Sequence, residues 1–482
     1  MTAPASWRTD VAGPYDVAVI GGGIHGVSAT YEAARRGLSV VLLERGDFGG
    51  GTSSNSMKIV HGGLRYLQDL DVRRVVSSHR EFRILRKIAP ELVQPLSCRL
   101  DVEGRGAAFA LKFRAGLALY HQVAQWAARA VPNAPVVPAS RFPGWYDGIV
   151  VDTEELLLAY LHTAFREGGG RVAVRNHTGD VTVARRDGRA IGVHTEQTGL
   201  VEARAVIECV GVAREGQPAG VAMNLVVDRL DLNADGHARG FVHPRDGRNV
   251  FTAPWRDASM VGTFERPFDG DSRRPLDVPP AWIDEFLAWL APAHPELAKL
   301  GRSDVRFVHA GLLPKDAPES AELSRASKLD EAEDGRIRVL GVKYTTSRAL
   351  ASRAVQRAAW RGGKAADDAL DRLVPLVSRR ELVREFVAAD ASRARRLAAS
   401  ELTTGEVEFA VGHELARDLS DVLFRRTRAA NAGHPGDALV AAVASEMAAL
   451  SGWTEAERAR QVERFERDVH FVSTRKVTAP RS

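Results

Sequence analysis

The stretch GGGIHG, residues 21–26, has the GxGxxG spacing of a loop that binds a dinucleotide. Its first glycine permits a tight turn, its second lets a pyrophosphate approach the backbone, and its third lets a helix pack closely on a strand. Glu44 follows at the distance expected of an acid that binds ribose hydroxyls. Because a carboxylate selects an unphosphorylated ribose, the pattern favours FAD or NAD over NADP. The cofactor contacts predicted in this unit are Gly21, Gly23, Ile24, His25, Gly26, Glu44 and Arg45.

A second candidate stretch, TSSNSMKIVHGGLRYL, covers residues 52–67 and lacks the periodic apolar positions of a core element. Its hydroxyls and free N–H groups suit a second contact to a pyrophosphate, and its Gly-Gly pair lets the chain run close to a flat ring. An NAD site usually continues into a further βα repeat, whereas a long polar loop stands here. We therefore expect FAD, with this loop running along the isoalloxazine ring.

The segments around these loops predict the elements that position them. Residues 16–20 and 38–44 are apolar runs typical of buried parallel strands, and residues 25–37 have helical character that ends at a glycine. Together they predict a βαβ unit. Further along, we expect a helix at 153–170, several strands at 171–211, a hairpin at 248–265, and a strand, turn and helix at 336–360. Helices are expected from residue 379 onward, with Thr454 and Glu457 as a capping box for the last one.

Length and composition limit the class of protein. The 482 residues are too many for one ordinary core, and 45% hydrophobic with 26% charged residues is typical of a globular protein. A formal net charge of +5, with the charges interspersed, does not indicate nucleic-acid binding. Two cysteines without a CxxC pair favour a reducing compartment, and we expect a cytoplasmic location because no signal peptide or membrane-spanning run is evident. The isolated histidines His309, His413 and His434 support no metal site.

Two further stretches leave a membrane contact open. Residues 107–130 predict an amphipathic, basic and aromatic helix. Such a helix either lies at the inner face of a membrane or packs as an ordinary surface helix. The basic cluster LFRRTR, residues 423–428, either touches lipid headgroups or a partner, or forms a solvated helical face.

Five motifs resemble, in order and spacing, the FAD-dependent glycerol-3-phosphate dehydrogenase/oxidase family, within the D-amino-acid-oxidase-like superfamily. They are GGGIHG, TSSNSMKIVHGGLRYL, FTAPW with VGTFE, GVKYTTSRALA and EVEFAVGHELARDLSDVLFRRTR. The resemblance spans most of the chain. It implies an α/β fold, in which a Rossmann-type FAD-binding domain is interleaved with a β-rich substrate domain and followed by a C-terminal α-helical domain. It also implies hydride transfer from a small hydroxy compound to flavin N5, with a quinone or oxygen as electron acceptor.

The resemblance assigns roles to single residues. It implies pyrophosphate contacts from Thr52, Ser53 and Ser54. It implies flavin contacts from Lys58, His61, Gly62, Gly63, Gly211, Gly341, Lys343, Thr345 and Thr346. It implies that the substrate is oriented by Arg65, Tyr66, Arg325 and Lys343. A cation near the N1 edge of a flavin stabilises the anionic reduced form, and Lys343 suits that role.

The sequence departs from the family on the substrate side. The family's NATGPW reads ECVGVA at residues 208–213, and its GTTD reads GTFE at 262–265. The family's substrate-facing histidine aligns with Asn224, and His237 is a less close stand-in. The family's phosphate-holding arginine aligns with Leu313, and the nearby Lys315 cannot replace a bidentate guanidinium. Loss of the histidine also removes a plausible proton acceptor for alcohol oxidation.

Three functions therefore stay open. The first is a dehydrogenase or oxidase of a polyol phosphate or related metabolite. The second is a tailoring oxidoreductase acting on a non-phosphorylated or larger hydroxy or amino substrate, and the third is a catalytically silent flavoprotein. In any of them we expect a disordered tail at 1–13, interleaved FAD-binding and substrate domains at 14–376, and a helical domain at 377–482. The substrate part is expected mainly at 80–150 and 214–320.

Overall fold

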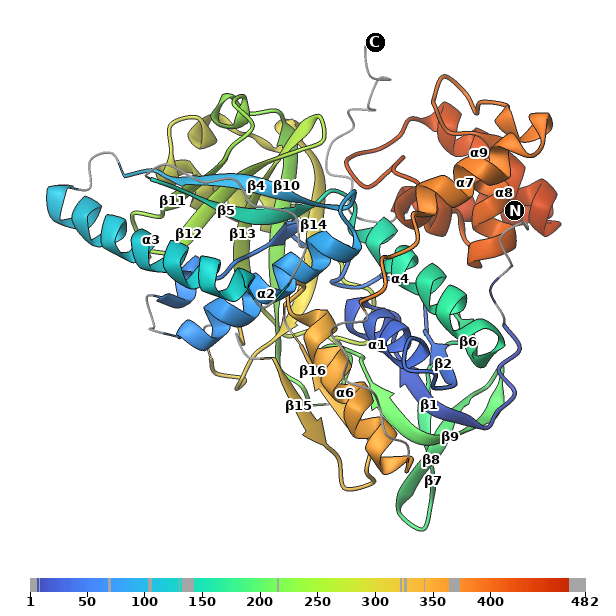
Figure 1. Cartoon of the computed structure of the whole chain (residues 1–482). Helices are drawn as coiled ribbons and strands as arrows, with labels where there is room; N and C mark the ends of the chain where they lie inside the picture. The colour runs from blue at the N-terminus through green and yellow to red at the C-terminus, as the bar shows by residue number, and fades with distance from the viewer. Residues whose placement is uncertain are drawn as a thin grey trace.

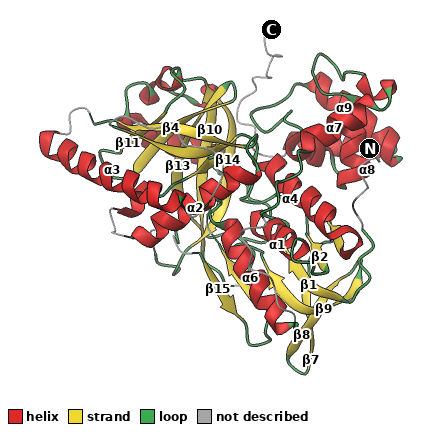
Figure 2. Ribbon diagram, viewed as in Figure 1, coloured by secondary structure: helices red, strands yellow, loops and turns green. Residues whose placement is uncertain are grey.

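The computed structural model contains two eight-stranded β-sheets and a C-terminal group of helices (Figure 1). Strands gather in the two sheets and helices cover them, as Figure 2 shows. The described residues are 7, 9–67, 71–102, 106–129, 131, 143–214, 216–320, 323–324, 327–341, 343–363 and 373–467, without the side chains at positions 65, 67 and 128. The α/β fold class with a helical C-terminal domain is confirmed.

The first sheet contains the predicted βαβ unit. Its order is β15-β16-β9-β1-β2-β6, and the hairpin of β7 and β8 extends it beside β9. β1 pairs in parallel with β2 and β9, so the glycine turn leaves the carboxyl end of a central strand. The strands are β1 (Tyr15–Ile20), β2 (Val40–Leu43), β6 (Val172–Arg175), β7 (Thr182–Arg186), β8 (Arg189–Thr195), β9 (Gly199–Glu208), β15 (Lys328–Glu331) and β16 (Ile337–Leu340).

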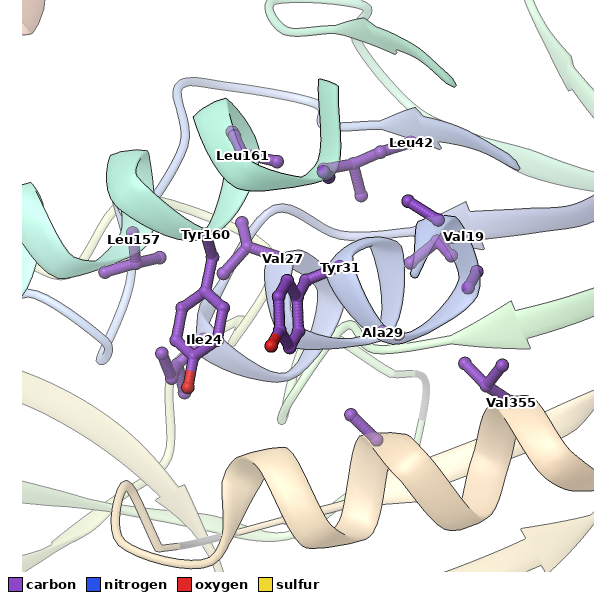
Figure 3. Packing of buried hydrophobic residues seen from close by; sticks show 14 of the residues in the cluster. Val19, Ile24, Val27, Ala29, Tyr31, Leu42, Leu157, Tyr160, Leu161 and Val355 are labelled. Atoms are coloured by element: carbon purple, nitrogen blue, oxygen red, sulfur yellow. The ribbon is translucent and has the colours of Figure 1, made fainter. Parts of the chain in front are cut away.

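Three helices cover one face of this sheet. They are α1 (Ile24–Ala34), α4 (Thr153–Gly168) and α6 (Ser347–Arg361). Figure 3 shows α1 lying between the other two, with Tyr31 of α1 beside Tyr160 of α4 and ring centroids 5.3 Å apart. The guanidinium of Arg348 on α6 donates to Glu32 of α1 at 2.9 Å and to Glu81 at 2.6 and 2.9 Å. All three charged side chains are buried, so the ion pairs fix the helices relative to one another.

The second sheet has the order β14-β10-β13-β12-β11-β4-β5-β3. Every neighbouring pair is antiparallel except β4 with β11. The hairpin predicted at 248–265 is confirmed as β12 and β13, and β3 lies outside both ranges predicted for the substrate part. The strands are β3 (Ile59–Val60), β4 (Val93–Leu100), β5 (Gly144–Val150), β10 (Ala219–Asp228), β11 (Ala238–Val242), β12 (Asn249–Trp255), β13 (Ala258–Phe268) and β14 (Val305–Pro314).

Alternation along β10 and β14 gives the second sheet two different faces. One face packs its apolar side chains on α5 (Pro280–Leu290). The opposite face turns toward the 52–66 loop, because a Cβ placed on Gly311 of β14 would lie 2.7 Å from Thr52. We call the β10, β13 and β14 residues on this opposite face the inner wall.

Two helices, α2 (Val72–Ile88) and α3 (Gly106–Ala128), lie beside the second sheet, and α3 projects at the edge of the molecule (Figure 1). α3 buries Leu117, Tyr120 and Ala127. Its other apolar stripe is open to solvent, with Leu111 70% and Trp126 63% exposed. Within the described residues, no helix has both the length and the apolar character to cross a membrane.

The C-terminal domain consists of α7 (Arg379–Ala388), α8 (Thr404–Glu414), α9 (Asp437–Ser451) and α10 (Glu455–Arg467). A short π-helical segment, Asp421–Arg426, lies between α8 and α9. Of the capping box predicted for α10, the bond from the Glu457 N–H to the Thr454 hydroxyl is present at 3.2 Å. The Glu457 carboxylate instead accepts from Arg460.

One prediction about an exposed segment is corrected. The LFRRTR cluster is not a solvated face, because the side chains of Arg425 and Arg426 are only 17% and 0% exposed and pair with Asp47. Within the segment 1–13, expected to be a disordered tail, the structure describes Trp7 and residues 9–13. Trp7 is 3% exposed and stacks on Phe165 with ring centroids 5.9 Å apart, because a large aromatic side chain gains more by burial than the short segment loses by ordering.

Candidate cofactor and substrate site

The glycine turn between β1 and α1 has the geometry that its spacing predicts. Gly21 adopts a φ of 99°, in the left-handed region that favours glycine. A Cβ on Gly26 would lie 1.8 Å from the carbonyl oxygen of Gly21, so no other residue fits there. Gly23 is the N-cap of α1, with no side-chain cap and no acid in the first turn. The N-terminus of α1 is therefore suited to receive an anion.

Glu44, at the end of β2, is held against this turn. Its carboxylate accepts from the N–H of Gly22 at 2.5 Å and from the N–H of Gly46 at 2.8 Å. Burial raises the pKa of Glu44 even though both donors favour the charged form. Arg45 follows it in the loop toward the 52–66 stretch.

The 52–54 segment joins the glycine turn to the inner wall. The Ser53 hydroxyl accepts from the N–H of Ile24 at 2.9 Å, at the start of α1. The Thr52 hydroxyl donates to the carbonyl of Leu312 on β14 at 2.8 Å. Ser54 is buried, and its hydroxyl has no hydrogen-bond partner among the described residues. Of the three predicted pyrophosphate residues, the structure thus places Ser53 at the N-terminus of α1 and Thr52 against β14.

The resemblance implies that Lys58 lines the flavin, but its side chain is buried within the protein. Its ammonium is buried and donates to the Ser54 carbonyl at 2.5 Å, to the Thr153 hydroxyl at 2.6 Å and to Glu154 at 3.3 Å. Burial lowers the pKa of Lys58, and the Glu154 carboxylate opposes that shift. This lysine ties the loop to the first turn of α4.

The HGG part of the loop is held by one buried carboxylate. Asp147 of β5 accepts from the N–H of Gly62 at 2.8 Å and from Nδ1 of His61 at 3.1 Å. Burial alone would raise the pKa of Asp147, but these donors hold it below its usual value. The His61 side chain remains 49% exposed. Gly63 follows with a φ of 93°, and a Cβ there would lie 2.7 Å from the ring of Tyr66.

Residues from the far end of the sequence close this site. The Lys343 ammonium lies 4.1 Å from the ring centroid of Tyr66, a cation–π distance. Gly341 packs against His25, because a Cβ there would lie 2.0 Å from the imidazole Nε2. Thr345 is buried, and Thr346 is the N-cap of α6 without a side-chain cap bond. The side chain of Arg65 and all of Arg325 lie outside the described residues.

The ECVGVA segment leaves β9 next to the glycine turn. Gly211 has a φ of 60°, and a Cβ there would meet no atom within 4 Å. Glu208 before it does not face a ligand, because it pairs with Arg214 at 2.6 Å and with Arg336 at 3.0 Å.

The charged residues of the inner wall include Glu265 of β13, which is paired with Ala222 of β10, whereas the positions of the family's histidine and arginine are uncharged. Asn224 of β10 is buried, and its Oδ1 accepts from the Thr263 hydroxyl at 2.8 Å. Asn224 is paired across the sheet with His309, and Gly220 with Leu313. The candidate substitutes for the missing groups lie elsewhere. His237 sits beside Asp235 before β11, and the Lys315 ammonium donates to the Pro318 carbonyl at 2.5 Å.

These features fit FAD. The N-terminus of α1, where Gly23 has no side chain to act as a cap, and the Ser54 hydroxyl, which has no partner among the described residues, offer donors to a pyrophosphate. Nε2 of His25 is a second buried polar atom without a partner among the described residues, and burial lowers the pKa of His25 to about 4, so its ring is neutral. Open space around Gly211 leaves its backbone accessible to a flat ligand.

Sequence reasoning missed the carboxylates that hold the loop. Asp147 lies in the apolar run GWYDGIV, where an isolated acid is the one signal that marks it. Asp47 lies within three residues of Glu44 and is 1% exposed, but nothing in the sequence shows that it faces the C-terminal domain.

Comparison with known proteins shows which family and which relatives the chain is similar to. The family described as FAD dependent oxidoreductase matches residues 16–338, and the C-terminal domain of alpha-glycerophosphate oxidase matches residues 378–458. A glycerol-3-phosphate dehydrogenase of Pseudomonas aeruginosa is 30% identical, over 86% of this chain and 91% of that protein. One from Synechocystis sp. is 27% identical, over 94% of this chain and 95% of that protein. The solved structure of the glycerol-3-phosphate dehydrogenase from Bacillus halodurans complexed with FAD shares the fold, with a TM-score of 0.69 and 22% identity over 97% of each chain.

Proposed function

The chain belongs to the FAD-dependent oxidoreductase family, and from that premise we propose that it oxidises the CH–OH group of an uncharged or larger hydroxy compound. The observation that carries the proposal is the loss of two groups from the inner wall, where Asn224 and Leu313 stand in place of the family's histidine and arginine. A phosphate dianion beside that wall would lose its hydration without gaining a bidentate partner, which is costly.

Side chains of this protein can bind the substrate and accept its hydroxyl proton. FAD, when bound, supplies the acceptor for the hydride that leaves the carbinol carbon. His61 suits the role of the base that takes the hydroxyl proton, because its ring is half-exposed and its Nδ1–H donates to Asp147. That bond leaves Nε2 as the accepting nitrogen. Lys343, stacked on Tyr66, adds a cation and an aromatic surface beside the same loop.

Anaerobic mixing of the FAD-loaded protein with candidate reductants tests the proposal. The panel contains glycerol 3-phosphate, glycerol, larger neutral polyols and hydroxy acids, and loss of flavin absorbance is followed. We expect an uncharged polyol or a larger hydroxy compound to bleach the flavin faster than glycerol 3-phosphate at equal concentration. The variant His61→Asn is expected to slow that bleaching about 100-fold with FAD retained, in the range of general base catalysis.

A second candidate is glycerol 3-phosphate itself, the compound in the names of the relatives. Two observations favour it: Lys343 and Tyr66 keep the family's types, and they lie together. Fastest bleaching by glycerol 3-phosphate would establish this candidate and overturn the first. If no compound bleaches a flavin that dithionite still reduces, both give way to a silent flavoprotein.

We also propose that α3 contacts a lipid surface and that a quinone takes the electrons. Leu111, Leu119 and Trp126 are spaced by eight and seven residues, which places them on one face of the helix. All three are exposed, and Lys112 beside them is exposed too. Such a face matches an interfacial helix.

Sedimentation with anionic vesicles tests this contact. The double variant Leu111→Ser/Trp126→Ser should lose most of its binding. Trp360→Ser is the matched control, because Trp360 is 82% exposed on α6. Equal binding by all three proteins, or none by the parent, would exclude α3 as a docking face.

A further inference from the structure

Two arginines of the C-terminal domain hold the loop that follows Glu44. The Arg426 guanidinium donates to both oxygens of Asp47, each at 2.7 Å, and Arg425 Nε donates to the same carboxylate at 2.6 Å. Asp47 and Arg426 are fully buried. Arg425 also pairs with Asp421 at 2.6 Å, and Arg426 donates to the Glu414 carbonyl. We name Asp47, Arg425 and Arg426 the interdomain clasp.

The ion pairs of the clasp exclude a metal site at this cluster of carboxylates. Asp47, His177 and Asp421 bring three potential metal ligands within 4.8 Å. However, the two guanidinium groups already neutralise both carboxylates, and the imidazole Nε2 lies 2.8 Å from Asp421. Buried, bidentate pairs of this kind are costly to break. The cluster therefore joins the two domains.

From Asp47, a short path of bonds leads to the glycine turn. The Gly49 N–H donates to the Gly22 carbonyl at 3.0 Å, two residues beyond Asp47. On the other side, Glu44 accepts from Gly22 and Gly46 through its side chain. The loop that carries the clasp is thus bonded on both sides of Asp47 to the turn that receives the cofactor.

A second set of ion pairs reaches the flavin side of the same loop. Arg428 of the C-terminal domain donates to Asp152 at 3.0 Å and to Glu155 at 2.9 Å, at the N-terminus of α4. The neighbouring Glu154 pairs with Lys58, whose ammonium also holds the Ser54 carbonyl. The C-terminal domain therefore contacts the loop after Glu44 directly at Asp47, and it reaches Lys58 indirectly through the N-terminus of α4.

We propose that the C-terminal domain sets the affinity for FAD, with Arg426 and Arg425 as positioning residues that hold the 44–54 loop closed on the cofactor. These arginines touch the loop and not the glycine turn itself, so they act through the position of Glu44, Gly49 and Ser53. The proposal rests on FAD as the cofactor and is independent of which substrate is oxidised.

FAD release from the holoenzyme tests the clasp. After dilution at 25 °C, flavin fluorescence gives the dissociation constant and the release rate, and far-UV circular dichroism confirms that the protein is folded. Arg426→Gln is expected to raise the dissociation constant at least tenfold. Arg425→Gln, which leaves the bidentate pair intact, should raise it about threefold, and Arg426→Lys should lie between the two, since a lysine keeps the charge but not the fork.

A matched control separates positioning from stability. Arg393 makes a bidentate pair with Glu408 within the C-terminal domain, at 2.9 and 3.0 Å. Arg393→Gln should lower the melting temperatures of apoprotein and holoenzyme together and leave the dissociation constant unchanged. Arg426→Gln should instead narrow the gap between the two melting temperatures, because that gap reports ligand affinity.

The outcomes decide the proposal even where a variant is unstable. If Arg426→Gln does not fold, Arg425→Gln and Arg426→Lys carry the comparison. A dissociation constant within twofold of the parent in the folded variants would overturn the proposal, as would an equal rise in Arg393→Gln. A slow substrate reaction with normal FAD affinity would likewise overturn the role of the clasp in FAD binding, and it would leave the proposed substrate class unaffected.

Discussion

The glycine turn and the inner wall face the same loop, but they are assembled in different ways. The turn is made of residues close in sequence within one βαβ unit, because Gly26 packs against the Gly21 backbone and the Gly22 N–H donates to the Glu44 carboxylate. The wall is made of side chains from three strands far apart in sequence, including Asn224, Thr263 and His309. The difference teaches that the cofactor end is fixed by backbone geometry, whereas the substrate end depends on side chains that the fold does not dictate.

This contrast predicts that the wall tolerates substitution better than the glycine turn does. A substitution in the wall alters one side chain on a regular strand, and the ladder of β10 with β14 remains. A substitution in the turn moves the backbone of β1 or α1. The cofactor site should therefore fail abruptly on mutation and the wall gradually.

The largest effect is expected from the substitution Gly26→Ala in the glycine turn. Its Cβ would lie 1.8 Å from the Gly21 carbonyl, so the helix and strand must separate. Overpacking costs about 3 kcal/mol at the upper end of its usual range, which corresponds to ~100-fold in FAD affinity. The flavin content of the purified protein measures this loss. Gly51→Ala is the control, because a Cβ there meets nothing within 4 Å, and it should retain FAD.

A smaller effect is expected from restoring a cation to the wall. Leu313→Arg should speed flavin reduction by glycerol 3-phosphate roughly tenfold, since a charge-assisted hydrogen bond contributes about 1.5–3 kcal/mol and part of it is spent on desolvation. Rapid-mixing kinetics at limiting substrate measure the change. Leu313→Met adds no charge and should leave the rate as it was. No gain from arginine, with FAD bound normally, would show that the phosphate is not held at this strand.

The smallest effect is a pH signature of the turn. Burial lowers the pKa of His25 from 6.5 to about 4. Since the unfolded chain takes up the proton first, this group's stabilisation is present above pH 6.5 and is lost as the pH falls toward 4. Near pH 5.5 the free energy of unfolding is lower by on the order of 1 kcal/mol, which shifts the Tm of the apoprotein by a few degrees.

His25→Asn should remove this component of the pH dependence. An unchanged profile in the variant would mean that the imidazole is accessible to water in the folded apoprotein.

The sequence predicted the parts of the fold that depend on local pattern. The βαβ unit, the α4 helix and the β12–β13 hairpin match their predicted ranges, because apolar periodicity and glycine turns act over a few residues. The ion-pair partners of Asp47 and Lys58 could not be predicted from the sequence, since these ion pairs join distant segments. The buried arginines of LFRRTR were misjudged for the same reason. A run of charges is usually solvated, and nothing local shows that a carboxylate from another domain covers it.

The bond between Asp47 and Arg426 joins residues 379 positions apart in the chain. During synthesis the glycine turn leaves the ribosome early, together with the strands that flank it. Arg425 and Arg426, which hold its loop, are synthesised 378 and 379 residues after Asp47. A nascent chain therefore carries a recognisable dinucleotide turn long before it carries the ion pairs that hold the loop of that turn.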